Sequence, residues 1–194
     1  MIGAIVNAPE VICQKKEIVG MILIETDRLI IRNLRELDSA DYYDMMGNFN
    51  VMRLIPREVM TREESDKHLK NLIDTDQVVS EKNVFGIEIR GKDEFIGICA
   101  FLKNNEKEDE IGCRLREKFW SQGYGTEVTK GLISYGFEEL KMEKITADVD
   151  ARNLNSIHTL RKFMNPTKEF FNEKDNCMDR RFELLKIDWL QQNM

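Results

Sequence analysis

Two glycines one residue apart, Gly123 and Gly125, stand where a strand-like segment gives way to a helical one. The first turn of a helix has backbone N–H groups without intrahelical partners, and the helix dipole adds positive charge there, so phosphate groups bind well at this point. Glycine has no Cβ, which lets phosphate oxygens approach the backbone closely. The spacing therefore predicts a phosphate-binding loop over residues 120–126.

Two familiar phosphate loops do not fit this segment. A P-loop requires Gly-Lys-Ser/Thr, whereas Thr126 and Glu127 follow Gly125 here. The dinucleotide fingerprint requires a third glycine, and Val128 occupies that position. Both of these nucleotide-binding classes are therefore excluded.

Hydrophobic periodicity predicts the elements that must position the loop. Strands are expected in two runs within 22–34 and over 84–90, 94–102, 108–116, 144–150, 167–172 and 181–189, and helices over 37–46, 62–73, 125–140 and 153–163. The three strands from 84 to 116 are typical of an antiparallel meander, and the strand–helix order after them implies a right-handed β-α-β unit. Residues 49–60 are expected to form a partly ordered loop.

Two helix starts are marked in the first third of the chain. A Thr61-x-x-Glu64 capping box opens the helix from Arg62. In the helix over 37–46, Asp38 is the expected cap. Its expected inward stripe, at spacings of three, is Leu37, Ala40, Tyr43 and Met46.

Composition narrows the function classes. The net charge is −6, from 29 Lys and Arg against 35 Asp and Glu, without the basic run typical of nucleic-acid binding. The four cysteines, Cys13, Cys99, Cys113 and Cys177, form no C-x-x-C pair, and Cys99 and Cys113 are expected to be buried thiols. This usage indicates a reducing cytoplasm and no metal site. Residues 1–6 are too short an apolar run for a membrane span. We expect an N-terminal extension of uncertain order over 1–20 and a single domain over 21–194.

Three motifs in the right order resemble the Gcn5-related N-acetyltransferase (GNAT) superfamily, and more closely its ribosomal-protein N-acetyltransferase (RimJ/RimL-like) branch. Members of that branch open with a strand like residues 25–32 (ETDRLIIR), read Trp-x-x-Gly-Tyr-Gly/Ala-Thr-Glu at the loop as residues 120–127 do, and carry Asn-x-x-Ser like Asn153 to Ser156. The resemblance covers roughly residues 22–190. It implies an α+β fold with a central, twisted, mostly antiparallel sheet, a parallel pair of strands that splay apart, and helices on both faces.

The resemblance also implies a path for acetyl-CoA between the splayed strands. Backbone groups of Cys113, Arg114 and Leu115 are expected to pair with the pantetheine arm, and Asn153 to hydrogen-bond it. The pyrophosphate is expected on the amides of Ser121, Gln122, Gly123, Tyr124, Gly125 and Thr126.

In this family the amine attacks the thioester directly, so a base must accept a proton. Glu110 is the candidate, because strand alternation puts it on one face with Gly112, which leaves space beside the carboxylate. The alternative is a solvated residue at the end of the acidic turn 106–110. Many members protonate the departing thiolate with a tyrosine on the last helix, which residues 153–163 lack. Ser156 is the candidate relay, with helix capping as the equal alternative; His158 is expected to be a surface or packing residue.

Two departures from the family pattern stand out. Trp120 replaces the Arg or Gln of the broad superfamily, although the RimJ/RimL-like branch has it, and residues 162–165 (KFMN) replace the usual Lys-x-Gly-Phe. The expected function is acetyl transfer to a primary amine, a protein N-terminus or a small molecule, with a homodimer compatible with it. The alternatives are an inactive acyl-CoA-binding regulatory module and a structural or interaction protein.

Overall fold

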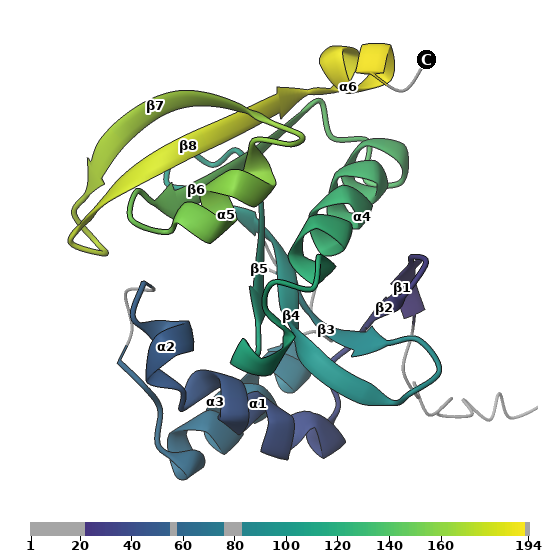
Figure 1. The fold of residues 1–194 in the computed structure, drawn as a ribbon, viewed down its shortest axis with the longest axis vertical. Coiled ribbons are helices and arrows are strands. Elements are labelled where there is room, and N and C mark those ends of the chain that lie inside the picture. The colour runs from purple at the N-terminus through teal and green to yellow at the C-terminus, as the bar shows by residue number, and fades with distance from the viewer. Residues whose placement is uncertain (1–21, 55–57, 76–82, 193–194) are drawn as a thin grey trace, which may run out of the picture.

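The computed structural model describes residues 22–54, 58–75 and 83–192, so the expected extension over 1–20 lies outside the described residues. These ranges form an eight-stranded sheet in the order β1-β2-β3-β4-β5-β6-β8-β7 (Figure 1). Its strands are β1 (Ile22–Glu25), β2 (Leu29–Arg32), β3 (Asn83–Ile89), β4 (Glu94–Lys103), β5 (Asp109–Leu115), β6 (Lys144–Asp150), β7 (Asn165–Asn172) and β8 (Cys177–Leu185).

Helices connect these strands and flank the sheet. They are α1 (Ser39–Met46), α2 (Phe49–Met52), α3 (Arg62–Thr75), α4 (Tyr124–Glu138), α5 (Leu154–Leu160) and α6 (Lys186–Gln192), with short 3-10 helices η1 (Glu36–Asp38) and η2 (Glu117–Phe119). No helix in the described ranges is both long enough and apolar enough to cross a membrane.

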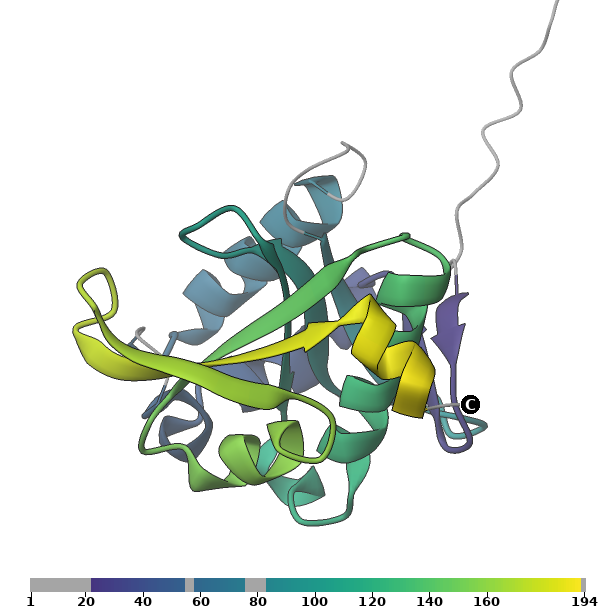
Figure 2. The same ribbon diagram turned by 90° about the horizontal axis from the view of Figure 1, so that it is seen from above.

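The sheet divides between β5 and β6. Every other neighbouring pair is antiparallel, whereas β5 and β6 are parallel and share the single residue pair Glu110↔Thr146. Beyond that pair β6 turns away from β5, as Figures 1 and 2 show from two directions. The expected fold class, including the splayed parallel pair, is confirmed.

Side-chain alternation along the central strands builds two cores on opposite faces of the sheet. Ile111 on β5 faces α4 and packs in one cluster with Val128 and Leu132. Val84 and Ala100 face the other way and pack in a second cluster with α1, α2 and α3. Helices therefore cover both faces, and β5 contributes Ile111 and Leu115 to the core under α4.

The N-terminal helix differs from its prediction. It begins at Ser39 after η1, and it buries Tyr42, Met45 and Met46, while Leu37 is 89% exposed and Ala40 is exposed. In a short helix, a spacing of three residues is compatible with more than one buried face. Packing against the sheet buries the face that has the larger side chains. The carboxylate of Asp38 does not cap α1; it accepts hydrogen bonds from Arg32 instead (2.8 and 2.9 Å).

Other predicted elements agree with the structure or differ at their ends. The meander strands, β6, α3 and α4 lie within two residues of their expected bounds, and the capping box is confirmed by Thr61 N–H donating to Glu64 Oε2 (2.8 Å). The loop expected over 49–60 contains the short α2. The strand expected over 181–189 is wrong in its second half, because the pairing of β8 with β6 ends at Leu185. The chain then forms α6, and Trp189 packs on Phe137 (5.3 Å between ring centroids).

Candidate active site

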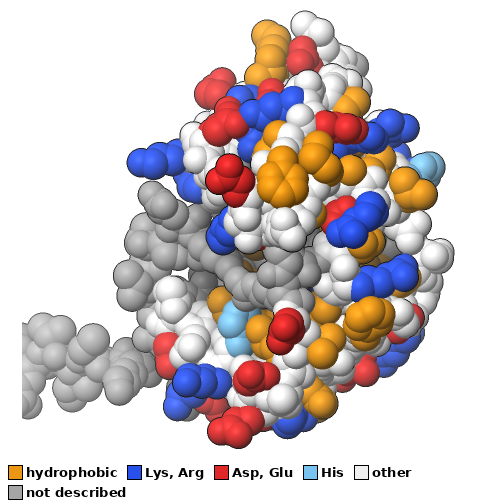
Figure 3. Space-filling model, turned by 90° about the vertical axis from the view of Figure 1, so that its left-hand side faces the viewer, with side chains coloured by type: hydrophobic (Ala, Val, Ile, Leu, Met, Phe, Trp, Pro, Cys, Tyr) orange, Lys and Arg blue, Asp and Glu red, His pale blue; other side chains and the backbone are white. Residues whose placement is uncertain are grey.

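A cavity of about 1110 Å³ passes through the sheet where β5 and β6 separate. On one face of the sheet its walls come from the start of α4, from β6 and from α5. On the other face they come from α1, α3 and the side chains of β3, β4 and β5 that point away from α4. Gly112 on β5 lines the cavity, and a Cβ built there meets no atom within 4 Å. On the face in Figure 3, hydrophobic side chains lie among charges of both signs.

The predicted phosphate loop has a backbone conformation that residues other than glycine rarely adopt. Ser121 and Gly123 both lie in the left-handed region, with φ of 59° and 81°. Gly123 is the N-cap of α4, and no side chain caps that helix start. A Cβ at Gly125 would only touch Leu115 at 4.0 Å, so the space above it opens to the cavity. The start of α4 is thus shaped to receive an anion.

Five of the six loop residues expected to hold a pyrophosphate line the cavity. Gln122 does not: its carbonyl oxygen accepts from Arg28 Nη1 (3.1 Å), and its side chain donates to the Lys118 carbonyl oxygen (2.8 Å). The five that line the cavity are Ser121, Gly123, Tyr124, Gly125 and Thr126.

Two of the motifs that carried the family resemblance are in direct contact. Glu127, in the first turn of α4, accepts hydrogen bonds from Arg28 N–H (2.8 Å), Arg28 Nε (2.6 Å) and Thr26 Oγ1 (2.6 Å). The Arg28 guanidinium also lies over the ring of Tyr124, 4.5 Å from its centroid. Arg28 therefore holds the loop from outside the cavity. The motif order alone gave no indication of this contact.

Strand alternation decides which backbone groups of β5 face the gap. Arg116 N–H donates to a β4 carbonyl oxygen (2.9 Å), whereas the Leu115 carbonyl oxygen accepts from Trp120 Nε1 (2.9 Å). Alternate residues point to opposite sides, so Cys113 N–H and C=O face the gap, and Arg114 turns its backbone to β4. The Arg114 side chain lies on the opposite face of the sheet from α4, with Nη1 3.2 Å from Met46 Sδ. Trp120 thus braces the turn that leads into the loop.

Cys113 is exposed, and it lines the cavity. The expectation that it is buried is wrong, because the separation of β6 removes the neighbour that would cover it. Its cross-strand partner Cys99 is buried as expected, and both thiols are free.

The start of α5 forms another wall. Asn153 is the N-cap, with its side-chain oxygen accepting from Ser156 N–H (3.2 Å), so the capping role of Asn153 is observed. Both residues line the cavity, and His158 is exposed at its edge. Lys162, just after α5, reaches back to the phosphate loop, where Nζ donates to Thr126 Oγ1 (3.2 Å). No motif in the sequence marks this cation beside the loop.

Glu110 is half-buried in the cavity wall at the last point where β5 and β6 pair. The backbone N–H of Asp148 acts on its carboxylate and favours the charged form. Burial is the largest influence and, together with the negative charge of Asp148, it raises the pKa of Glu110 to about 7, against the opposing effects of that N–H and of Arg181. Such a carboxyl group exchanges a proton near neutral pH, as a general base must.

Beyond Glu110 the wall of β6 and the β7–β8 hairpin is acidic. Asp150 and Asp179 are cross-strand partners that are 7% and 6% exposed. Arg152 pairs with Asp150 (2.6 Å), while the Asn172 amide donates to both Asp179 (2.8 Å) and Asp175 (2.9 Å). Carboxylates therefore outnumber cations at this end of the cavity.

The sequence is similar to those of known acetyltransferases. The family model for an acetyltransferase (GNAT) domain matches residues 28–163. The uncharacterized N-acetyltransferase YnaD of Bacillus subtilis is 30% identical over 152 residues, which are 77% of this chain and 86% of that protein.

Solved structures share the fold. RimL, a ribosomal L7/L12 α-N-protein acetyltransferase in complex with coenzyme A, superposes with a TM-score of 0.70 at 17% identity, covering 85% of this chain and 98% of the other. Spermidine N-acetyltransferase from Vibrio cholerae, in complex with CoA and spermine, gives a TM-score of 0.71 at 18% identity, covering 85% and 99%.

Proposed function

The chain belongs to the GNAT family of acyltransferase enzymes, and from that premise we propose that it moves the acetyl group of acetyl-CoA onto a primary amine. The observation that carries this proposal is the continuous cavity, which joins the open start of α4 to the half-buried Glu110 through the divided sheet.

In this proposal, the pyrophosphate of acetyl-CoA lies on the backbone amides at the start of α4. Gly123 and Gly125 allow the close approach, and the helix dipole favours the negative charge. Lys162, held 3.2 Å from Thr126 Oγ1, supplies a cation to the phosphates. Arg28 keeps the loop in shape through Glu127 and the Gln122 carbonyl oxygen.

The pantetheine arm takes the place of the missing strand partner of β5. Cys113 N–H and C=O and Leu115 N–H face the gap, and an amide-containing chain can pair with them as a strand does. The Asn153 side-chain oxygen caps α5, which leaves its amide NH₂ as the group to hydrogen-bond the arm. Arg114 contributes its side chain to the acceptor side rather than its backbone to this arm.

The reaction in this site is a direct displacement. The amine nitrogen attacks the thioester carbon, the C–N bond forms, and the C–S bond breaks as CoA leaves as a thiolate. Glu110 accepts the proton that the nitrogen loses, directly or through water, and the space at Gly112 holds the amine beside it. Ser156, at the α5 wall, gives its hydroxyl proton to the thiolate and regains one from solvent, so CoA is released as the thiol.

The acidic end of the cavity supports an amine as the acceptor. Most primary amines are cations at neutral pH, and the carboxylates of Asp148, Asp150, Asp175 and Asp179 line their approach. The relatives' names cover a protein N-terminus and spermidine, and both are amines of this kind.

The test measures release of free CoA thiol from acetyl-CoA with a panel of amines: a peptide with a free N-terminus, a polyamine, an amino acid and an aminoglycoside. We expect release with at least one amine and an acetylated product of matching mass. Thermal shift runs beside it, since a ligand at 100 times its dissociation constant stabilises a protein by about 2.7 kcal/mol. Stabilisation by acetyl-CoA without release would favour the inactive binding module. Stabilisation by ATP or NAD but not by CoA would overturn the proposal.

A further inference from the structure

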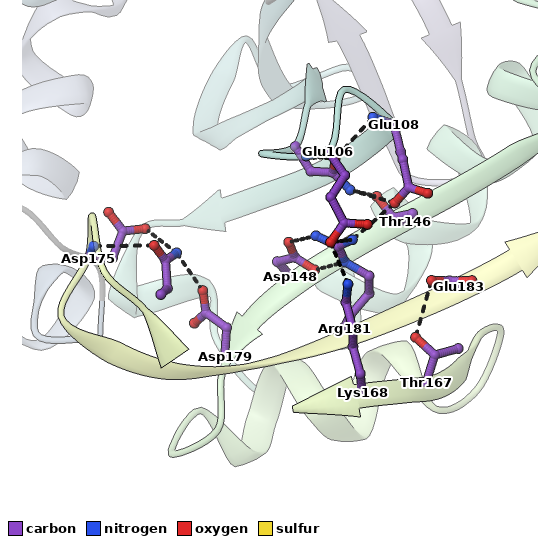
Figure 4. A network of polar contacts seen from close by, with 12 residues as sticks. Glu106, Glu108, Thr146, Asp148, Thr167, Lys168, Asp175, Asp179, Arg181 and Glu183 are labelled. Atoms are coloured by element: carbon purple, nitrogen blue, oxygen red, sulfur yellow. Dashed lines mark hydrogen bonds and ion pairs between the residues drawn. The ribbon is translucent and has the colours of Figure 1, made fainter. Parts of the chain in front are cut away.

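Arg181 is the largest side chain that the described part of the fold buries completely, at 1% exposed. It lies on β8 and donates two parallel hydrogen bonds to Asp148 on β6, Nε to Oδ1 (2.8 Å) and Nη2 to Oδ2 (2.7 Å) (Figure 4). A paired, bidentate arginine–carboxylate contact fixes both groups in one geometry. Asp148 therefore has a defined position although it stands on the strand that leaves β5.

The same guanidinium reaches the turn before β5. Nη1 lies 3.0 Å from Glu108 Oε2 and 3.0 Å from Glu106 Oε1, and Lys144 and Lys168 complete the ion pairs of these two glutamates. Figure 4 shows Glu106 and Glu108 from this turn and Asp148 from β6 converging on Arg181. The ion pairs join the turn before β5 to β6 and β8, whereas the backbones of β5 and β6 share only the pair Glu110↔Thr146.

This network ends beside Glu110. The β6 partner of Glu110 is Thr146, two residues before Asp148, and Glu110 and Asp148 both line the cavity. The backbone N–H of Asp148 acts on the Glu110 carboxylate, so whatever holds Asp148 also sets the surroundings of that carboxylate. The charges act in opposite directions: the Asp148 carboxylate raises the pKa of Glu110, and the Arg181 guanidinium lowers it. Neither side chain needs to touch a substrate to influence the proton on Glu110.

We propose that Arg181 and Asp148 are a positioning pair. The pair orients the carboxylate of Glu110 at the point where β5 and β6 separate, and it places one positive and one negative charge behind that carboxylate. The proposal rests on Glu110 being the base of the proposed reaction. The residues of the phosphate loop take no part in it.

Asp179 on β8 also acts on Glu110, with the same sign as Asp148. The other ionisable side chains around the cavity stay unchanged in the test below. They are Arg53 after α2, His68 on α3, Lys103 on β4, Cys113 and Arg114 on β5, Tyr124 on α4, Asp150 on β6, His158 on α5, Lys162 after α5, Lys174 and Asp175 in the β7–β8 turn, and Cys177 on β8.

The test compares the pH dependence of kcat/KM for Asp148→Asn, Arg181→Gln and the double variant, with one acceptor. Glu110 must be deprotonated to act, so the rate rises with pH through its pKa. Asp148→Asn removes a repelling charge, and we expect the acid limb to move down by roughly one pH unit. Arg181→Gln removes an attracting charge, and the limb moves up by a similar amount. In the double variant the two shifts largely cancel.

The neighbouring residue offers a matched control. Arg180 pairs with Glu169 at the edge of the sheet, and Arg180→Gln makes the same chemical change one position away without touching the network. We expect its acid limb to match that of the unmodified chain. Arg181→Lys keeps the charge but loses the bidentate geometry, so we expect a lower kcat with a nearly unshifted limb. If all variants lose rate without opposite shifts, or if Arg180→Gln shifts as Arg181→Gln does, the proposal is wrong.

A readout without catalysis separates this inference from the proposed function. In protein labelled with ¹³C at glutamate carboxyl carbons, the Glu110 signal, assigned with Glu110→Gln, reports its titration directly. Opposite shifts of this signal in Asp148→Asn and Arg181→Gln support the positioning pair even in a chain without transferase activity. An unmoved signal in both folded variants overturns the positioning pair and leaves the proposed reaction standing. Folding of each variant is checked by thermal unfolding.

Discussion

The two sides of β5 are built in different ways. Towards α4, the proposed cofactor side, consecutive residues supply the backbone groups, and the loop from Trp120 to Glu127 follows in one stretch. Towards α1 and α3, the proposed acceptor side, the wall is made of single side chains from many elements, of which Glu110 and His68 are two. Backbone recognition leaves a short sequence motif. Side-chain recognition from scattered positions leaves none.

The two sides also differ in how they are held. The phosphate loop is tied to the N-terminal strands by Arg28 and Thr26, through contacts with Glu127. The carboxylate on the other side depends on Asp148 and on the buried Arg181 behind it. The comparison predicts that each side can be damaged while the other keeps its function.

The largest difference between the effects on the acceptor side and on the cofactor side is expected from Glu110→Gln. Loss of a general base lowers kcat by about 10²- to 10⁴-fold, while the phosphate loop is untouched. Steady-state rates and the dissociation constant of acetyl-CoA by calorimetry measure the two sides separately. An undiminished rate would remove Glu110 from the mechanism. An equal loss in cofactor affinity would break the distinction between the sides.

Gly112→Leu is expected to come next. No atom lies within 4 Å of a Cβ at this position, so we expect the variant to fold with the added side chain in the acceptor space. An intrusion that needs about 1–3 kcal/mol of adjustment lowers kcat/KM for the amine by roughly 10- to 100-fold. Acetyl-CoA affinity should stay the same.

Gly97→Ala is the contrasting glycine change. Its Cβ would lie 2.2 Å from the Arg114 carbonyl oxygen, so β4 and β5 must move apart. We expect a lower melting temperature and weaker binding on both sides. A stable Gly97→Ala together with an unfolded Gly112→Leu would contradict the account of the cavity.

Arg28→Ala is expected to weaken acetyl-CoA binding by about fivefold. Charge-assisted hydrogen bonds contribute about 1.5–3 kcal/mol when protected, and the Arg28 side chain is 47% exposed, so we reduce this to about 1 kcal/mol. Calorimetry measures the change. The control is Arg62→Ala, which removes a similarly exposed arginine that pairs with Asp66 and lies over Tyr43. Equal effects of the two variants would show that Arg28 has no particular role at the loop.

The smallest effect is expected from Lys162→Ala. Its ammonium is at the exposed edge of the phosphate site, so we expect a loss in acetyl-CoA affinity of a few-fold that shrinks as salt is added. The same titrations at low and high ionic strength measure it. A loss that does not depend on salt would point to a packing role instead.

Sequence reasoning reached the cofactor side and most of the fold for a physical reason. Gly123, Gly125 and the strand before them act through local backbone geometry, which short-range spacing encodes. The ion pairs of Arg28 with Glu127 and of Arg181 with Asp148 join residues far apart along the chain, so spacing carries no sign of them. Glu110 could be predicted from the sequence because strand alternation places it on the same face as Gly112.

Errors occurred where tertiary contacts chose among local possibilities. The first helix turned Tyr42 rather than Leu37 to the sheet, and the tail became helical at Lys186 once β8 had no further partner on β6. Cys113 is exposed because the neighbouring strand diverges, and an apolar run in the sequence is the same with or without that neighbour.

Binding of acetyl-CoA to a Gly125→Asp variant tests the central claim most directly. An aspartate in the first turn of α4 suits the helix dipole, and its side chain has room, so we expect a folded protein with an unchanged or higher melting temperature. The added negative charge lies where the pyrophosphate is proposed to bind, so calorimetry should detect no binding of acetyl-CoA. Asn165→Asp, which makes the same charge change on the exposed β7, should bind as the unmodified chain does. Tight binding of acetyl-CoA to folded Gly125→Asp would contradict the account.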